Sequence, residues 1–540
     1  GGVNNITTAG GGDQVTLTGG TNTVDTGSSG DTVTLSTGTD TVDTGSGNDT
    51  VEAGGTLTTA DTIDGGANTD TIASTVAMTD ALAARLSNFE IFDIKGSGGV
   101  THDVSVLTGL TSLKASAALS GAVVITDLAV GAEADISAAI ANNLTINQIN
   151  AAGGGTDTLT FDFSGGTYTT GASIIAPNIE TVTLKTSAGG TKTVSGATFV
   201  DAATLNITAS SANLTISDLT ALNLQTFDVS STSSRATDIT TGADVFSQAL
   251  TYTGGGGNDT LDLDGTTLQN TFVYNGGNGN DALELDGAAL QNTFSYNGGS
   301  GADSLNLNGA TLSGALTFDG GSGDDTLNLD GATLAAGSVF VVGDDQDTLT
   351  LNADAVASVV RTSATTSNNA FSVQDDATTA HTAGFTSGSD TFDYNGSVSH
   401  GSTTTIVKAA GATLQAAVAA DADATVYVLQ DADGDADFET ALNLFADGVS
   451  SSRANTLETE AIDTGLLSYS GLDTAFNSSD IVLLAIDSET NEDGTTANDG
   501  GTAIYRFRNS DTTTADTVLT SEIELLGVFQ DAALGVADFI

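Results

Sequence analysis

The sequence has no cysteine and no tryptophan, a single proline (Pro177) and very few basic residues. Without cysteine it can form neither a disulfide framework nor a thiolate nucleophile, and it lacks thiolate ligands for zinc. Lys and Arg number 11 among 540 residues against 68 Asp and Glu, giving a formal net charge of -57. Because so few internal cations are available, we expect divalent cations from solvent to neutralise the acids. The same charge argues against nucleic acid or an anionic membrane surface as a partner.

Long hydrophobic runs are also missing. The longest, such as Ile481 to Ile486, are far too short to cross a bilayer, so we expect no membrane insertion. The chain opens with Gly1-Gly2 and shows no basic region followed by an apolar stretch. Since Gly1 falls inside a repeat, we expect the chain to be a processed or C-terminal portion of a longer protein.

A nine-residue period runs through residues 1–75. Acidic or amide residues recur once per repeat at Asn4, Asp13, Asn22, Asp31, Asp40 and Asp49, and after an insertion at Asp61 and Asp70. A large apolar residue follows two positions later, at Ile6, Val15, Val24, Val33, Val42 and Val51. One well-preserved copy reads Thr44-Gly-Ser-Gly-Asn-Asp-Thr-Val-Glu52. This pattern resembles the RTX nonapeptide G-G-x-G-x-D-x-U-x, in which U is a large apolar residue.

A second block, residues 251–351, has a 22-residue period. Its aspartates are Asp259, Asp281, Asp303, Asp325 and Asp347, each followed by leucines two and four positions later. The turn before each Asp is glycine-rich, as in Gly298-Gly-Ser-Gly-Ala-Asp303. A second turn recurs as Asp264-Gly265, Asp286-Gly287, Asn308-Gly309 and Asp330-Gly331.

These periods predict a stacked fold. Alternating apolar residues indicate short strands with one buried face, and such strands must stack to share an interior. Two nonapeptides, or one 22-residue unit, make one coil. We therefore predict an all-β protein: a right-handed parallel β-helix, similar to an RTX β-roll, with insertions and a mixed, mainly β C-terminal domain.

Stacked coils place the aspartates in ladders about one strand spacing apart, ~4.8 Å, where their charges repel. Calcium between adjacent turns would reverse this repulsion, because it is bound by carboxylate and backbone carbonyl oxygens. The candidate aspartate ligands are Asp13, Asp31, Asp40, Asp49, Asp70, Asp259, Asp281, Asp303, Asp325 and Asp347. The turn glycines that would direct carbonyl groups are Gly45, Gly47, Gly255, Gly257, Gly277, Gly279, Gly299, Gly301, Gly321 and Gly323.

Facing turns of neighbouring coils would each supply half a site. In the nonapeptide block this pairs Asp13 with Asp31 and Asp31 with Asp49 on one edge, and Asn22 with Asp40 on the other. The Asn22 site should be weaker because it lacks a charge. In the 22-residue block neighbouring coils pair Asp259 with Asp281, Asp281 with Asp303 and Asp303 with Asp325. The alternative for any one Asp is an ordinary turn residue.

Other acidic turns leave both possibilities open. The Asp-Gly turns of the 22-residue block could bind metal or simply turn the chain. The loop from Asp431 to Asp437 alternates carboxylates at Asp431, Asp433 and Asp435, as calcium loops do. It departs from the EF-hand pattern, with Gly at its fourth position and no Glu at its twelfth. We expect this loop to bind calcium, the alternative being a solvated turn.

The other two segments lack a strict period. Residues 76–250 contain strand-like pieces and a short helix from Thr79 to Leu86, capped by Thr79, and predict an irregular continuation of the solenoid. Residues 352–540 predict longer strands mixed with helices. The strands are expected at residues 426–429, 481–486, 503–507 and 523–529, and the helices near 414–420 and 438–445.

Together, the repeats resemble those of bacterial RTX surface-layer proteins of the Caulobacter type. The resemblance rests on repeats over roughly 170 residues. It implies a calcium-binding β-helix that tiles into a two-dimensional lattice of many copies on the cell surface. It also implies an anchoring region upstream of Gly1, bound to cell-surface polysaccharide. The ending Leu534-Gly-Val-Ala-Asp-Phe-Ile540 resembles an uncleaved type I secretion signal, so we expect a secreted, extracellular protein.

Two other functions stay open. A calcium-dependent RTX adhesin or biofilm-matrix protein would share the solenoid but present a ligand-binding domain. An enzyme is the weaker alternative. His102, His381 and His400 do not form H-E-x-x-H, and no G-x-S-x-G elbow is present. A β-helix polysaccharide-modifying enzyme would need clustered bases, which the sequence does not show, so we expect no enzymatic activity.

Overall fold

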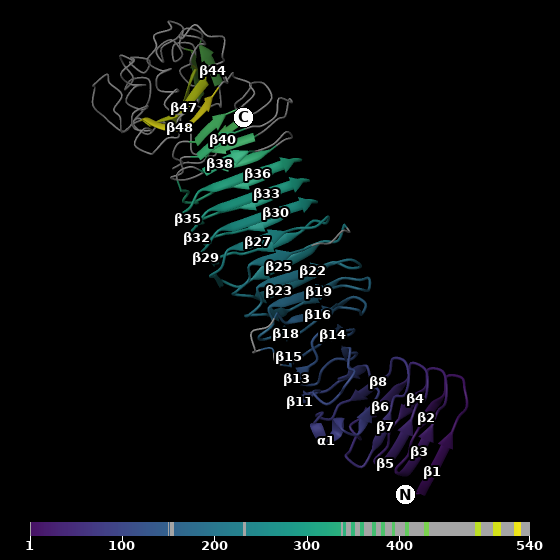
Figure 1. Cartoon of the computed structure of the whole chain (residues 1–540). Helices are drawn as coiled ribbons and strands as arrows, with labels where there is room; N and C mark the ends of the chain where they lie inside the picture. Colours follow the sequence, from purple (N-terminus) through teal and green to yellow (C-terminus); the bar gives the residue numbers. More distant parts are fainter. Residues whose placement is uncertain are drawn as a thin grey trace. The chain divides into compact units, whose positions relative to one another are not determined.

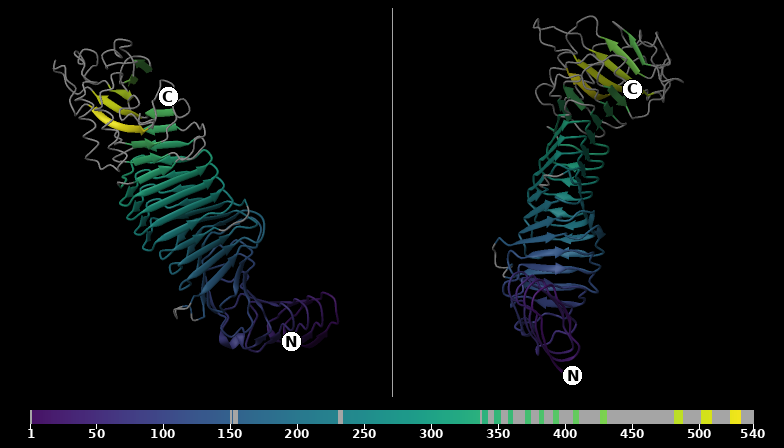
Figure 2. Two further views of the ribbon diagram at one scale, coloured as in Figure 1. Left: turned by 45° about the horizontal axis from the view of Figure 1, so that its top comes forward. Right: turned by 90° about the vertical axis from the view of Figure 1, so that its right-hand side faces the viewer.

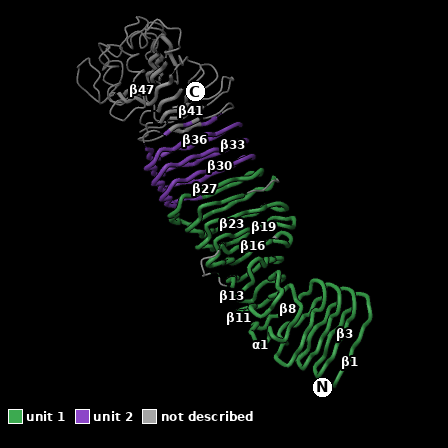
Figure 3. The backbone as a smooth tube through the Cα atoms, viewed as in Figure 1, with its two compact units in different colours: residues 1–262 green, residues 263–540 purple. Residues whose placement is uncertain are grey.

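The computed structural model describes residues 2–149, 151, 156–229, 234–335, 338–341 and 347–351, and nine further strands between residues 357 and 530 (Figure 1). The chain divides into two compact units, residues 1–262 and 263–540, shown in separate colours in Figure 3. In each unit short strands stack as successive coils (Figure 2). The fold is a parallel β-helix, which confirms the predicted fold class.

The nonapeptide block forms two facing parallel sheets. One contains β1 (Gly2–Thr7), β3 (Gly20–Asp25), β5 (Gly38–Asp43), β7 (Thr62–Asp64) and β9 (Leu86–Ser87). The other begins with β2 (Gln14–Thr16), β4 (Thr32–Thr34), β6 (Thr50–Gly54) and β8 (Thr71–Ser74). Register follows the 18-residue coil, since Val15 pairs with Val33 and Val33 with Val51. These valines are buried, so the period-two alternation correctly predicted the inward face.

The remainder of the first unit continues the stack without a strict period. The second sheet extends through β10 (Ile91–Asp93), β12 (Ser112–Ala115), β14 (Glu133–Ile136), β16 (Thr158–Asp162), β19 (Thr181–Lys185), β22 (Thr204–Thr208), β24 (Thr226–Asp228) and β27 (Leu250–Thr253). Facing it are β11 (Val100–Asp103), β13 (Val123–Leu128), β15 (Leu144–Gln148), β17 (Tyr168–Thr169), β18 (Ser173–Ile175), β20 (Lys192–Val194), β21 (Gly196–Thr198), β23 (Leu214–Thr220), β25 (Thr237–Thr241) and β28 (Thr260–Asp262). A short strand, β26 (Val245–Phe246), lies between β25 and β27 in sequence.

One helix occurs among the described residues. It is α1 (Asp80–Ala83), and the Thr79 side chain accepts a hydrogen bond from the Leu82 N–H as its N-cap. The predicted cap is confirmed, and the helix is shorter than the predicted span. No helix in the described part of the chain is long and apolar enough to span a bilayer.

The second unit repeats three parallel strands per coil. Two sheets hold β30 (Phe272–Asn278), β33 (Phe294–Ser300), β36 (Leu316–Ser322) and β38 (Ser338–Val341), and β31 (Ala282–Glu284), β34 (Ser304–Asn306), β37 (Thr326–Asn328) and β39 (Thr348–Leu351). The third is narrow, with β29 (Thr267–Leu268), β32 (Ala289–Leu290) and β35 (Thr311–Leu312). Tyr274, Tyr296 and Phe318 stack with ring centroids 5.0 Å apart, so their ladder follows the strand spacing.

The later strands include four in parallel coils and a mixed sheet. The parallel ones are β40 (Ala357–Val360), β41 (Ala370–Val373), β42 (Ala380–Ala383) and β43 (Thr391–Tyr394). The mixed sheet contains β44 (Ile406–Ala409), β45 (Val426–Gln430), β46 (Ile481–Asp487), β47 (Gly501–Arg508) and β48 (Ile523–Gln530), with β46, β47 and β48 antiparallel. The four strands predicted here are confirmed. The helices predicted near 414–420 and 438–445 lie outside the described residues.

Candidate metal-binding turns

The nonapeptide block, residues 1–75, forms a roll of stacked coils, and a continuous column of acidic side chains lies at one edge of it. The column consists of Asp13, Asp31, Asp49 and Asp70. Each aspartate accepts a hydrogen bond on Oδ1 from the backbone N–H of the aspartate one coil earlier. The donor–acceptor distances are 2.8 Å from Asp13 to Asp31, 2.7 Å from Asp31 to Asp49 and 2.7 Å from Asp49 to Asp70. The pairing of successive coils predicted for this edge is therefore confirmed.

The second carboxylate oxygen of these residues is the unusual feature. Asp31, Asp49 and Asp70 are 2%, 1% and 0% exposed, and Oδ2 of each is buried without a hydrogen-bond partner. A buried charged oxygen that is neither hydrated nor hydrogen-bonded is costly. Burial raises the pKa of Asp70 to about 6, and the nearby charges of Asp49 and Glu90 add to that shift. This column therefore lacks a positive counter-charge.

Glycine turns enclose each carboxylate. In the turn before Asp49, Gly45 and Gly47 have φ values of 87° and 146°, in the left-handed region that favours glycine. A Cβ on Gly45 would lie 2.1 Å from the carbonyl oxygen of Gly27, so the stacked turns approach each other through backbone alone. The glycines thus allow the backbone of one turn to lie directly against the carbonyl groups of the next.

The opposite edge of the roll is different. Asp40 is fully buried, and its Oδ1 accepts from Asn22 Nδ2 at 2.6 Å while its Oδ2 accepts from the Ser36 N–H at 2.9 Å. Asp61 is likewise saturated, because Asp40 N–H donates to Oδ1 and Thr58 N–H to Oδ2. The sequence repeat places an equivalent residue at both edges. Of the two edges, the one with Asp40 and Asp61 is where both carboxylate oxygens accept hydrogen bonds from the protein.

The second unit repeats the first arrangement in its 22-residue coils. Asp281, Asp303 and Asp325 donate their N–H groups to Oδ1 of the next aspartate at 2.7, 2.8 and 3.0 Å, the last acceptor being Asp347. Asp303 is buried, its Oδ2 has no hydrogen-bond partner, and burial raises its pKa to about 6. Two of the predicted pairs, Asp281 with Asp303 and Asp303 with Asp325, are therefore in contact, and Asp325 and Asp347 form a third pair.

The glycines of these turns have the same roles as in the roll. Gly299 and Gly301 have φ values of 108° and 126°, and a Cβ on Gly301 would lie 1.9 Å from the Gly279 carbonyl oxygen. Gly277, Gly279, Gly321 and Gly323 also have φ values between 102° and 119°. A side chain at Gly299, Gly301, Gly321 or Gly323 would overlap the carbonyl oxygen of the glycine one coil earlier.

The other predicted acids differ from one another. Asp259 accepts from the Thr237 N–H at 2.8 Å and the Gly255 N–H at 3.1 Å, and Gly257 packs against the Arg235 carbonyl. In the Asp-Gly turns the Asp286 N–H donates to Asp264 Oδ1 at 2.7 Å, whereas the buried Oδ1 of Asp286 has no hydrogen-bond partner. Asp431, Asp433 and Asp435 lie outside the described residues.

The structure adds acids that the period did not indicate. Glu90 continues the first column, since its Oε2 accepts from the Asp70 N–H at 2.9 Å. Asp157 and Glu180 repeat this contact, also at 2.9 Å. Each of these acids stands two residues before a buried apolar residue, as in Glu180-Thr-Val182, and this short signature could have revealed them.

The donor set fits calcium better than other metals. No three His, Cys, Asp or Glu side chains converge as a ready metal cluster within the described part of the chain. Each turn instead offers one carboxylate together with backbone carbonyls, the hard oxygen donors that calcium accepts in sites of six to eight ligands. Zinc would need His or Cys ligands, which these turns do not contain.

No family model, curated protein or solved structure matches this chain. The resemblance to RTX surface-layer proteins therefore rests on the repeats themselves.

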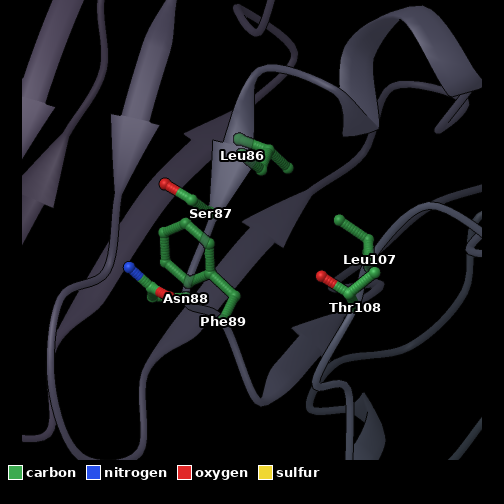
Figure 4. Close-up of a pocket in the computed structure, with 6 residues that line it drawn as sticks. All are labelled: Leu86, Ser87, Asn88, Phe89, Leu107 and Thr108. Atoms are coloured by element: carbon green, nitrogen blue, oxygen red, sulfur yellow. The ribbon is translucent and has the colours of Figure 1, made fainter.

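A small pocket lies near α1 and does not compete as a ligand site. It is lined by Leu86, Ser87, Asn88, Phe89, Leu107 and Thr108 (Figure 4). Its cavity volume of about 10 Å³ is enough for a single water molecule.

Proposed function

We propose that this chain is a secreted structural protein that folds on binding extracellular calcium and then assembles with copies of itself into a cell-surface lattice. The observation that carries this proposal is the column of buried aspartates with an unpartnered Oδ2, seen at Asp31, Asp49 and Asp70 and again at Asp303. Neighbouring carboxylates ~5 Å apart repel by about 3 kcal/mol at an effective dielectric constant near 20. A cation between the coils converts each repulsion into attraction.

Metal-coupled folding gives calcium control over the fold. Extracellular modules of this kind bind calcium at ~10⁻⁴–10⁻³ M, far above the free calcium of a cytosol. The acidic repeats would stay unfolded during export, consistent with type I secretion, and would order outside the cell. Bound calcium would also reduce the net charge of -57 that otherwise keeps copies of the chain apart.

The described surface lacks one feature that the adhesin alternative would use. Every phenylalanine and tyrosine whose side chain is described is buried, so this surface offers no aromatic ring on which a sugar could stack. The adhesin alternative would need its ligand site elsewhere in the chain. Attachment to cell-surface polysaccharide is part of the proposal and rests on the resemblance of the repeats.

Electron microscopy tests the proposal. Purified protein would be imaged in excess chelator and again after adding millimolar calcium, with millimolar magnesium as the matched control. Ordered sheets that form with calcium alone are the expected result. Calcium-induced folding of monomers without sheets would reject the lattice and favour the adhesin, and sheets in chelator would reject calcium control.

A further inference from the structure

The few basic residues of this chain are unevenly distributed. Residues 1–75 and 251–351, which contain the RTX-like repeats, have no Lys or Arg. The segment between them has six: Arg85, Lys95, Lys114, Lys185, Lys192 and Arg235. The part of the solenoid without the repeated glycine turns is therefore the part that carries its own cations.

Lys192 is the most unusual of these residues. It begins β20 and faces the interior, with 0% of its surface exposed. Its ammonium group donates hydrogen bonds to three backbone carbonyl oxygens, those of Gly165, Gly166 at 2.6 Å and Gly189 at 3.0 Å. Three N–H donors thus meet three acceptors, which compensates the cost of burying the charge.

The carbonyl groups come from two stacked Gly-Gly turns. One reads Ser164-Gly-Gly-Thr167 and the other Ala188-Gly-Gly-Thr191, and the strands that follow pair Tyr168 with Lys192 in parallel. Gly190 has a φ of 94°, and a Cβ there would lie 2.7 Å from the Thr167 nitrogen. Adjacent coils therefore aim glycine carbonyls at one buried point, and a side-chain ammonium fills that point.

The outer face of the same segment shows a second form of internal neutralisation. Lys185 contacts both Glu133 and Asp162 at 3.0 Å. Strand register places Lys114 between Asp93 and Asp135, and the Lys114 charge opposes the rise in the pKa of Asp135 that burial causes. Lysines thus interrupt the acidic ladder on this face, which runs Asp93, Lys114, Asp135, Asp162 and Lys185.

We infer that Lys192 is a built-in cation that replaces a metal ion between two coils, so that the segment around it, residues 164–196, folds without calcium. The calcium dependence of the repeat blocks rests on the proposed function. The assignment of the Lys192 site does not depend on it. The ligand class follows from the geometry: a carbonyl cradle with three acceptors suits a primary ammonium ion. Truncating Lys192 should leave a site that binds such an ion from solution.

Hydrogen exchange of the full chain, read peptide by peptide, tests the inference. In the wild-type protein, peptides within residues 164–196 should keep the same protection in chelator and in calcium, while peptides of residues 26–54 lose theirs in chelator. Loss of protection in 164–196 on chelation would overturn the inference. Equal protection of 26–54 in both conditions would reject calcium control and leave the Lys192 site standing.

Chemical rescue tests the cradle itself. Lys192→Ala should speed exchange in peptides around residues 165–196 at least tenfold, and ethylammonium should restore most of the protection. Tetramethylammonium, which has the charge but no N–H donor, should not. Lys114→Ala is the matched control and should show neither the large loss nor the rescue. Unchanged exchange in Lys192→Ala, or equal rescue by both ions, would overturn the assignment.

Discussion

Replacing Asp303 by Asn should change stability in opposite directions with and without calcium. Asn keeps Oδ1, the acceptor for the Asp281 N–H, but removes the charge at the buried Oδ2. Asp303 has acidic neighbours one coil away on both sides, Asp281 and Asp325. Each repulsion at ~5 Å is worth about 1 kcal/mol in water and about 3 kcal/mol at an effective dielectric constant of 20. In chelator, Asp303→Asn should therefore stabilise the second unit by about 1–3 kcal/mol.

Calcium should reverse this sign. With about 10 mM calcium and a dissociation constant of ~10⁻⁴–10⁻³ M, each filled site stabilises the folded state by about 1.4 to 2.7 kcal/mol. Asp303 would contribute to the site on each side of it, so its loss weakens two sites. In calcium, Asp303→Asn should therefore destabilise the unit by up to about 3–5 kcal/mol, less the relief of repulsion.

Asp319→Asn is the matched control. Asp319 is exposed, and the equivalent position one coil earlier is already Asn297. Urea unfolding of the full chain, followed by exchange of peptides around residues 294–328, would give the stability of this unit in chelator and in calcium. Asp319→Asn should have little effect in either condition. A destabilising effect of Asp303→Asn that is equal in both conditions would refute the reasoning, because a merely structural carboxylate would behave that way.

Three further comparisons test other parts of the account. Gly301→Ala should lower the free energy of unfolding by several kcal/mol, because its Cβ would overlap the carbonyl oxygen of Gly279. Gly309 has a φ of 65°, and a Cβ there would lie 4.0 Å from its nearest neighbour, the Gly287 nitrogen. Gly309→Ala should therefore cost only the ~1–2 kcal/mol of a left-handed backbone. Asp40→Asn should lower the free energy of unfolding by about 1–3 kcal/mol equally with and without calcium, because its amide would face the backbone N–H of Ser36. Asp31→Asn should instead lower the affinity for calcium, because Oδ2 of Asp31 has no protein partner. Calcium titrations of both variants separate these effects. Burial lowers the pKa of His102 from 6.5 to about 4, so its neutral form stabilises the fold above pH 6.5, and this stability is lost as the pH falls to about 4. This contribution of His102 to the free energy of unfolding is worth roughly 3 kcal/mol between pH 7 and 4. His102→Asn should remove it, as measured by urea unfolding at both pH values. An unchanged pH profile would contradict this prediction.

The periodic blocks were predictable because their inward positions are fixed by stacking. A slip of one residue would turn Val33 or Leu305 outward, so the apolar alternation determines the strands and their register. The pairing of Asp31 with Asp49, and of Asp303 with Asp325, follows from that register alone.

The difference between the two edges of the roll could not be predicted in this way. Asp40 and Asp49 occupy the same position of the nonapeptide, yet Asp40 is saturated by Asn22 and the Ser36 N–H while Asp49 Oδ2 lacks a partner. That outcome depends on side chains brought in from another turn. The Lys192 cradle depends likewise on carbonyl groups of a coil more than 20 residues earlier, which no local pattern encodes.

Far-ultraviolet circular dichroism of the chelated full chain, titrated with calcium and separately with magnesium, tests the central claim most directly. The account predicts a cooperative gain of β-structure between ~0.1 and ~1 mM calcium, with no such gain in magnesium. A chain that shows its full β-structure in chelator, unchanged by calcium, would contradict the claim that calcium orders these turns.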